Sequence, residues 1–188
     1  GSALSRVVFR GVSLLNAIPR EAFATIALPE SNQQALEAAF NSFTDLIKSE
    51  LGKVETEIVS FNQPRTSITS VMAARDQSRL INLLNSCPNG VMRMSDDIEG
   101  VVETSLNVGV ITTEETHVSI LCLIRSLIDS GRQQVEQVLT SLATLAGAEL
   151  QFSGAYPGWK PDADSEIMAV FRDMYNPIDG QKPNKMAI

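Results

Sequence analysis

The chain has 188 residues, and the 44% that are hydrophobic suffice for one domain with a real core or for two small ones. Its formal net charge of −7 argues against nucleic acid and anionic membrane surfaces as partners. We find no signal peptide, and no apolar run approaches the roughly 20 residues of a membrane span. Its two cysteines, Cys87 and Cys122, lack the spacing of a metal or redox motif, so we expect both to be reduced in a cytoplasmic protein.

The first predicted elements are two short strands joined as a hairpin. Residues 6–15 and 22–28 are both rich in apolar side chains. A turn signature lies between them around Asn16 and Pro19, and proline cannot continue a strand ladder. We therefore expect residues 6–28 to form a β-hairpin.

An amphipathic helix is predicted after this hairpin. Ser31 and Gln34 have the spacing of a capping box, and Gly52 marks the helix end. We expect Glu57–Phe61 to return as a strand. The apolar residues that recur at steps of three and four along the helix are Leu36, Phe40, Phe43, Ile47 and Leu51.

A connector separates these elements from the next group. Pro64 breaks the preceding strand, and the best-defined helix of the connector is Arg75–Asn85. Cys87–Gly90 contains both proline and glycine and is expected to end that helix. Residues 62–100 are therefore predicted to be a helical connector.

The clearest β pattern lies in residues 101–128. Val101–Ile111 and His117–Leu127 flank the polar turn Thr112–Thr116, which is typical of a hairpin. Both faces of the second strand carry apolar residues, so we expect much of it to be buried. Arg125 is the exception, because its guanidinium must reach water, pair with an internal carboxylate or bind an anion. The pattern alone leaves these alternatives open.

The second strand leads into a helix that resembles the first one. Ser130 and Gln133 repeat the capping-box spacing, Gly147 ends the helix, and Glu149–Phe152 is expected to be a return strand. The apolar positions of the two helices align without a gap, and so do the strands before them. We therefore predict an α+β fold of two β-β-α-β repeats, with mainly antiparallel sheet and with helices on one face.

The last part of the chain is predicted to be helical. It opens with a turn that contains Tyr156 and Trp159, and Asp164–Tyr175 has apolar residues on one helix face. The four predicted parts are a first β-β-α-β unit at 3–61, a helical connector at 62–100, a second unit at 101–155 and a C-terminal segment at 156–188.

Side chains for independent catalysis are scarce. His117 is the one histidine and has no second ligand at metal spacing, so a surface strand residue is the simpler interpretation. The aspartates Asp96, Asp97, Asp162 and Asp164 lie in polar loops, as solvated turn residues do. We find no glycine-rich phosphate loop, nucleophile elbow or two-histidine helix. The residues alone thus indicate a binding or assembly module.

Five stretches of the sequence carry a resemblance to a known family. They are Asn16–Ile26, Pro88–Val91, Val101–Gly109, Leu123–Gly131 and Gly154–Trp159. Together they resemble aminoacylhistidine dipeptidase, the bacterial Xaa-His dipeptidase of a two-zinc metallopeptidase family. The stretches occur in the family's order, and the resemblance covers almost the whole chain.

The resemblance implies that this chain is one part of a larger hydrolase. The family has a catalytic domain that holds two zinc ions and a lid domain inserted into it, and this chain resembles the lid. The family's zinc ligands lie before and after the lid in sequence. The resemblance therefore implies no metal ligand, no catalytic residue and no enzyme activity in this chain alone, and residues 156–188 would lead toward the catalytic domain.

The resemblance also assigns roles to two residues. Asn16 matches a lid asparagine that helps to bind substrate, and Arg125 matches a lid arginine that holds the substrate's terminal carboxylate. Arginine suits that role because its planar fork fits a carboxylate. Leu15, beside Asn16, departs from the polar or basic residue that the family tends to have there.

The expected function is that of a non-catalytic lid which binds the substrate carboxylate and supports dimerisation of a cytoplasmic dipeptidase. Its partners would be a second copy of the chain and, in the complete enzyme, a dipeptide. The alternative is a free-standing or engineered self-assembling or ligand-binding module derived from that lid. An independent hydrolase is disfavoured by the single histidine.

Overall fold

The computed structural model describes residues 5–11, 15–17, 21–55, 57, 58, 60, 62, 71–160, 162 and 165–179. The chain divides into two compact units, one of residues 1–8 and 24–78 and one of residues 9–23 and 79–188. No helix within the described part is long and apolar enough to cross a membrane.

The first unit contains parts of two strands and a long helix. β1 (Ser5–Gly11) and β2 (Ala22–Ala27) are neighbours in the sheet, which confirms the predicted hairpin. A short 3-10 turn, η1 (Glu30–Asn32), leads into α1 (Gln33–Leu51). α1 is amphipathic as predicted, but none of its residues is buried, and Phe43 is 61% exposed. Leu36, Phe40 and Ile47 are half-buried, so the apolar face of α1 is only partly covered.

The predicted capping box at the start of α1 does not form. The Asn32 amide donates to the Pro29 carbonyl at 2.9 Å, which closes the η1 turn and places Ser31 inside it. Asn32 occupies the N-cap position, and its side chain makes no capping hydrogen bond. A turn that closes before the helix has thus taken the place of the side-chain cap.

The second capping box is also absent, for a similar reason. α3 (Asp129–Ala146) begins one residue before Ser130, and its N-cap, Ile128, makes no side-chain cap bond. The Ser126 hydroxyl instead donates to the Ile128 carbonyl at 2.8 Å and closes the turn between strand and helix. At the other end, Gly147 adopts the left-handed conformation predicted for a C-cap, with φ of 63°.

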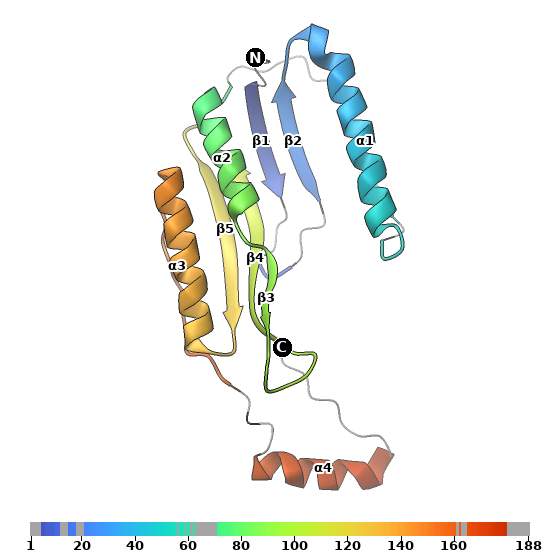
Figure 1. Cartoon of the computed structure of the whole chain (residues 1–188), viewed down its shortest axis with the longest axis vertical. Coiled ribbons are helices and arrows are strands. Elements are labelled where there is room, and N and C mark those ends of the chain that lie inside the picture. The colour runs from blue at the N-terminus through green and yellow to red at the C-terminus, as the bar shows by residue number, and fades with distance from the viewer. Residues whose placement is uncertain are drawn as a thin grey trace. The chain divides into compact units, whose positions relative to one another are not determined.

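Three antiparallel strands form the centre of the second unit. β4 (Val102–Thr113) pairs along one edge with β5 (Val118–Ser126) and along the other with β3 (Gly90–Met94). β4 also pairs at its far end with Arg10 and Gly11 of β1. β4 and β5, with 12 and 9 residues, are the longest of the described strands, and Figure 1 shows β5 beside α3. β4 is therefore held from both sides.

The predicted hairpin of residues 101–127 is confirmed, but its burial is not. The Glu114 amide donates to the His117 carbonyl at 2.9 Å and closes the turn between β4 and β5. We expected β5 to be largely buried, whereas its side chains are half-buried or exposed, and Leu121 is 49% exposed. The reason is that the packed helix covers only one face of the hairpin.

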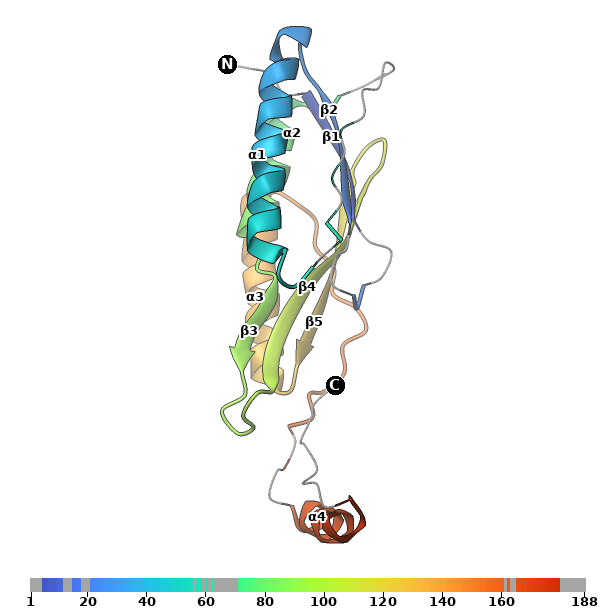
Figure 2. The ribbon, with the colours of Figure 1, turned by 90° about the vertical axis from the view of Figure 1, so that its right-hand side faces the viewer.

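The small core of the second unit lies between α3 and the sheet (Figure 2). Leu106 of β4 and Val135 of α3 are each only 1% exposed, and Leu139 lies beside them. Partly buried apolar side chains surround this cluster, namely Cys87, Cys122 and Ile124. Burial of these side chains is what holds α3 to the hairpin.

The predicted return strand at Glu149–Phe152 is wrong. These residues form no strand, and Leu150 and Phe152 are 43% and 42% exposed. Two apolar residues in four cannot bury enough surface to order a strand without ladder bonds. Of the other predicted return strand, Glu57, Ile58 and Ser60 are described and are not in a strand, while Val59 and Phe61 lie outside the described residues.

The remaining elements agree with the α+β class. α2 (Ala74–Ser86) confirms the predicted connector helix, and α4 (Glu166–Asp179) confirms the C-terminal one. β3 was not predicted, because the strand has only five residues and all of them are exposed, so it lacks an alternating apolar pattern. Residues 149–152 are irregular, so the predicted β-β-α-β unit at 101–155 is observed as β4, β5 and α3 without a fourth element.

Gly131 provides a test of how closely α3 approaches the sheet. A Cβ atom at this position would lie 2.5 Å from Thr104 Oγ1 and 2.6 Å from Ser126 Oγ, and these hydroxyls bond to each other at 2.8 Å. We expect Gly131→Ala to lower the free energy of unfolding by about 1–3 kcal/mol, because the helix must move away. Urea unfolding followed by circular dichroism measures this.

The matched control for that experiment is Ser130→Ala. Ser130 is exposed and makes no capping bond, so its loss should change stability by less than about 0.5 kcal/mol. Equal effects of the two substitutions would contradict the close packing at Gly131.

Candidate functional site

Arg125 lies on the face of the β4–β5 hairpin that α3 leaves uncovered. Leu106 and Ile124 are directly opposite in the ladder, and both pack against the core on the α3 side. Ser105 and Arg125 form the next pair, and successive residues of a strand point to opposite faces. Arg125 is therefore exposed on the open face, and no described residue pairs with its guanidinium.

The exposure of Arg125 decides between the three alternatives for its guanidinium, namely water, an internal carboxylate or an anionic ligand. Arg125 is neither buried nor paired with an internal carboxylate among the described residues. It is the second-last residue of β5, a strand that pairs with β4 along its length. Its guanidinium reaches water in this structure and is available to an anionic ligand.

The turn that carries Asn16 is bound to β4, the strand that pairs with β5. Asn107 Nδ2 donates to the carbonyl oxygens of Leu15 and Ala17, at 2.8 and 3.0 Å. Asn16 itself is exposed between these two anchored neighbours. Leu15 takes part through its backbone carbonyl, so its departure from the family's polar residue leaves this contact intact.

The two residues assigned by resemblance therefore share one face of the sheet. Asn107 pairs with Leu123, which lies two residues from Arg125 on β5 and so points to the same side. Diagonal neighbours across a ladder lie about 7–8 Å apart. The structure thus brings the Asn16 turn and Arg125 to neighbouring positions on the open face, which we call the Arg125 face.

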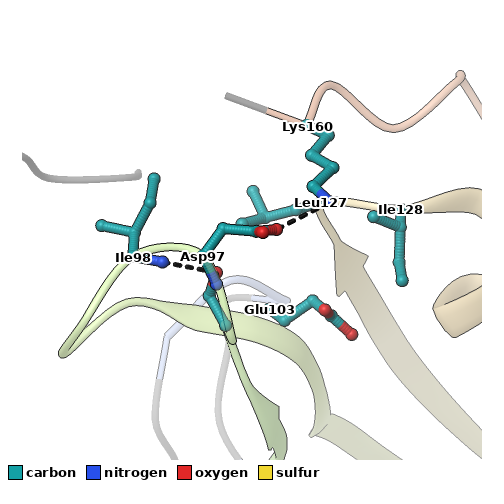
Figure 3. Close-up of a pocket in the computed structure, with 7 residues that line it drawn as sticks. Asp97, Ile98, Glu103, Leu127, Ile128 and Lys160 are labelled. Carbon is teal, nitrogen blue, oxygen red and sulfur yellow. Dashed lines mark hydrogen bonds and ion pairs between the residues drawn. The ribbon is translucent and has the colours of Figure 1, made fainter. Parts of the chain in front are cut away.

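A pocket lies beside Glu103 and Leu127, two positions along the chain from Ser105 and Arg125, and Figure 3 shows its lining residues. The Leu127 amide donates to the Glu103 carbonyl at 2.9 Å, and both residues line the pocket. The other lining residues are Ser95, Asp97, Ile98, Ile128 and Lys160.

The charges of this pocket are already engaged with one another. Lys160 Nζ lies 2.7 Å from Asp97 Oδ2, and the hydrogen bond to Asp97 raises the pKa of Lys160, so it remains protonated. The Glu103 carboxylate is 9% exposed and lies 3.4 Å from Arg93 Nε. The first pair links the 95–98 loop to the segment at Lys160, and the second links β3 to β4 beside the pocket.

The described residues do not fit a zinc site. No group of three His, Cys, Asp or Glu side chains converges anywhere in the described part of the chain. His117 is exposed next to the β4–β5 turn, as predicted, with Nε2 3.6 Å from Glu114 Oε2. We therefore derive no metal chemistry from these residues.

The two cysteines meet on the opposite face of the sheet, at the core. Both are free and both contact the Leu106 cluster. A hydrogen bond with the Cys122 thiol lowers the pKa of the Cys87 thiol to about 7, although partial burial opposes this effect. The same bond, together with burial, raises the pKa of Cys122 above its usual value.

Two comparisons relate the chain to known proteins. The crystal structure of aminoacylhistidine dipeptidase from Vibrio alginolyticus matches 98% of this chain with a TM-score of 0.91 and 67% sequence identity. The cytosol non-specific dipeptidase of Escherichia coli is 45% identical over 181 residues, which is 96% of this chain. The chain is therefore related to a segment of these dipeptidases.

The likeness confirms the resemblance found in the sequence and also shows its extent. The chain spans 37% of the length of each of these two proteins. No protein-family model matches it. The activity of the whole dipeptidase is accordingly a matter for proposal rather than a property of this segment.

The family resemblance singled out Asn16 and Arg125, whereas Asn107 was not singled out from the sequence. A signal was available, since asparagine is depleted in strands and Asn107 stands in the middle of the long run of β4. A polar residue at such a position usually has a specific hydrogen-bond partner. Its partners were not predictable, because they are backbone carbonyls of a distant turn.

The Cys87 thiol yields a prediction about pH. Since its pKa is about 7, we expect alkylation by iodoacetamide to reach half its maximal rate near pH 7. In Cys122→Ala, which removes the hydrogen bond, the midpoint should rise toward the usual value of about 8.5. Mass spectrometry of the Cys87 peptide measures both profiles, and identical midpoints would contradict the coupling of the two thiols.

Proposed function

We propose that this chain forms the substrate-binding lid of an aminoacylhistidine dipeptidase, in which Arg125 binds the terminal carboxylate of the dipeptide. The observation that carries the proposal is the exposed guanidinium, which has no partner among the described residues, on a strand that pairs with β4 along its length. Two parallel N–H bonds from such a fork fit a carboxylate, and a rigid strand fixes their direction.

Asn16 supplies the second contact to the substrate in this proposal. Its turn is docked on the Arg125 face by two hydrogen bonds, and its own amide remains exposed. An amide group can both donate and accept, so it suits a peptide group of the substrate. Arg125 and Asn16 together would hold a dipeptide at one end and along its backbone.

Hydrolysis itself is assigned to parts of the dipeptidase that this segment does not contain. The family resemblance implies two zinc ions, which we propose are held there. The lid then contributes binding and orientation, which raise the rate by holding the scissile bond in place. The cytosolic location stated in the name of the E. coli relative is the one we propose here.

We also propose that the chain self-associates through the outer edge of β5. That strand pairs with β4 on one edge, and no described strand pairs with the other. An unpaired strand edge is a template for a second chain, and the exposed Leu121 adds apolar surface beside it. β1 lies between β2 and β4 and therefore has a neighbouring strand on each side.

Self-association predicts a molar mass of twice the single chain in light scattering at high concentration. Leu121→Lys should weaken the dimer, because a charged side chain on an edge strand opposes its pairing with a second chain. Val54→Lys is the control, since Val54 is 82% exposed and lies outside the sheet. A monomeric mass at every concentration would overturn the dimer proposal.

The carboxylate role of Arg125 is tested in a complete dipeptidase that contains this segment. We expect Arg125→Ala to lower kcat/KM for dipeptides by about 30- to 1000-fold, since a bidentate charged pair contributes roughly 2–4 kcal/mol. Arg125→Lys should recover only part of this loss, because an ammonium cannot make the two parallel bonds. Zinc content should not change in either variant.

Arg75→Ala is the matched control for this loss of charge. Arg75 is an exposed arginine on α2, away from the β4–β5 hairpin in sequence, and its removal should leave kcat/KM within about twofold. Near-normal turnover by Arg125→Ala would show that the arginine has no role in substrate binding.

A further inference from the structure

Asn107 is a polar residue inside a strand, and its side chain binds the backbone of a distant segment. It stands in the interior of β4, and its amide nitrogen donates to two backbone carbonyls of another segment, those of Leu15 and Ala17. An amide group has two N–H donors, so both are engaged. The side chain therefore serves to hold that segment rather than to fill the core.

The two acceptors lie on either side of Asn16. Fixing the carbonyl before a residue and the carbonyl of the residue after it restricts the backbone on both sides. Asn16 is exposed between them, so the path of this anchored backbone decides where its side chain points. The position of the Asn16 amide thus depends on Asn107.

Gly109 is a second, independent feature, because its lack of a side chain leaves room for the Asn16 turn on β4. A Cβ atom there would lie 3.0 Å from the Leu15 carbonyl oxygen, 3.1 Å from Leu15 Cα and 3.3 Å from Asn107 Nδ2. Gly109 also lies at the irregularity of the β4–β5 ladder between Val108 and Val110. The strand is therefore shaped to accept the turn where Asn107 binds it.

The same strand also fixes Arg125. Ser105, two residues before Asn107 on β4, is the ladder partner of Arg125. β4 is paired on both edges, which limits its movement. Asn107 therefore sets the distance between the Asn16 turn and the arginine on a common rigid element.

We propose that Asn107 is a positioning residue for the substrate, which acts through Asn16 and not by touching the dipeptide. The inference rests on the proposed function, because it requires that Asn16 contacts substrate. It adds a residue whose role is to keep the two contacts at the spacing of a dipeptide.

The experiment uses a complete dipeptidase that contains this segment, with Asn107→Ala, Asn16→Ala and the double variant. We expect each single variant to lower kcat/KM for a dipeptide by about tenfold, since misplacing a binding group by about 1 Å is costly. If Asn107 acts through Asn16, the double variant should be no worse than Asn16→Ala alone. Zinc content and thermal unfolding are measured for every variant.

Two further variants keep the test independent of folding defects. Gly109→Ala leaves both amides in place but crowds the turn, and it should lower kcat/KM as Asn107→Ala does. Asn89→Ala is the matched control, because Asn89 Oδ1 accepts from the Val108 amide at 2.9 Å, next to Asn107, but does not hold the turn. It should stay within about twofold of the parent enzyme.

The outcomes separate this inference from the proposal on which it rests. Multiplied losses in the double variant, or near-normal activity of Asn107→Ala, would overturn the positioning role while Arg125→Ala still reports on the carboxylate. Full activity of Asn16→Ala would overturn the positioning role and remove Asn16 from the proposed function as well. A loss in Asn89→Ala equal to that in Asn107→Ala would assign the effect to general strand stability and overturn the inference.

Discussion

The pairing of β4 along both of its edges is the constraint on which the candidate site depends. β5 pairs with one edge and presents Arg125, while β3 and the end of β1 pair with the other. One face of this strand packs against α3 through Leu106. Its other face is left to hold the Asn16 turn. A central strand held on three sides gives two exposed side chains fixed positions, which a flexible loop could not do.

The fold was predictable where the local pattern and the tertiary structure agree. Period-two alternation and a polar turn located the β4–β5 hairpin, and apolar residues at helical spacing located α1 to α4. The capping boxes and the Glu149–Phe152 strand failed, because each rests on a short motif. The local conformation there depends on hydrogen bonds from residues outside the motif, such as the bond from the Ser126 hydroxyl to the Ile128 carbonyl.

The candidate site was predictable only in part. Asn16 and Arg125 were identified by resemblance, and alternation placed Arg125 on a strand with both faces apolar. The pattern could not say which face α3 covers, and so could not show that Arg125 is exposed. The tie between Asn107 and the turn joins residues 92 and 90 positions apart, and no local signal encodes such a contact. Only the folded chain shows that both residues lie on one face.

The carboxylate role of Arg125 is the central claim, and varying the substrate tests it most directly. A complete dipeptidase that contains this segment is assayed with one dipeptide as its free acid and as its C-terminal amide. The account predicts a preference for the acid of about 30- to 1000-fold, which is nearly lost in Arg125→Ala because the cation no longer distinguishes the two. An unchanged preference for the acid in Arg125→Ala would contradict it.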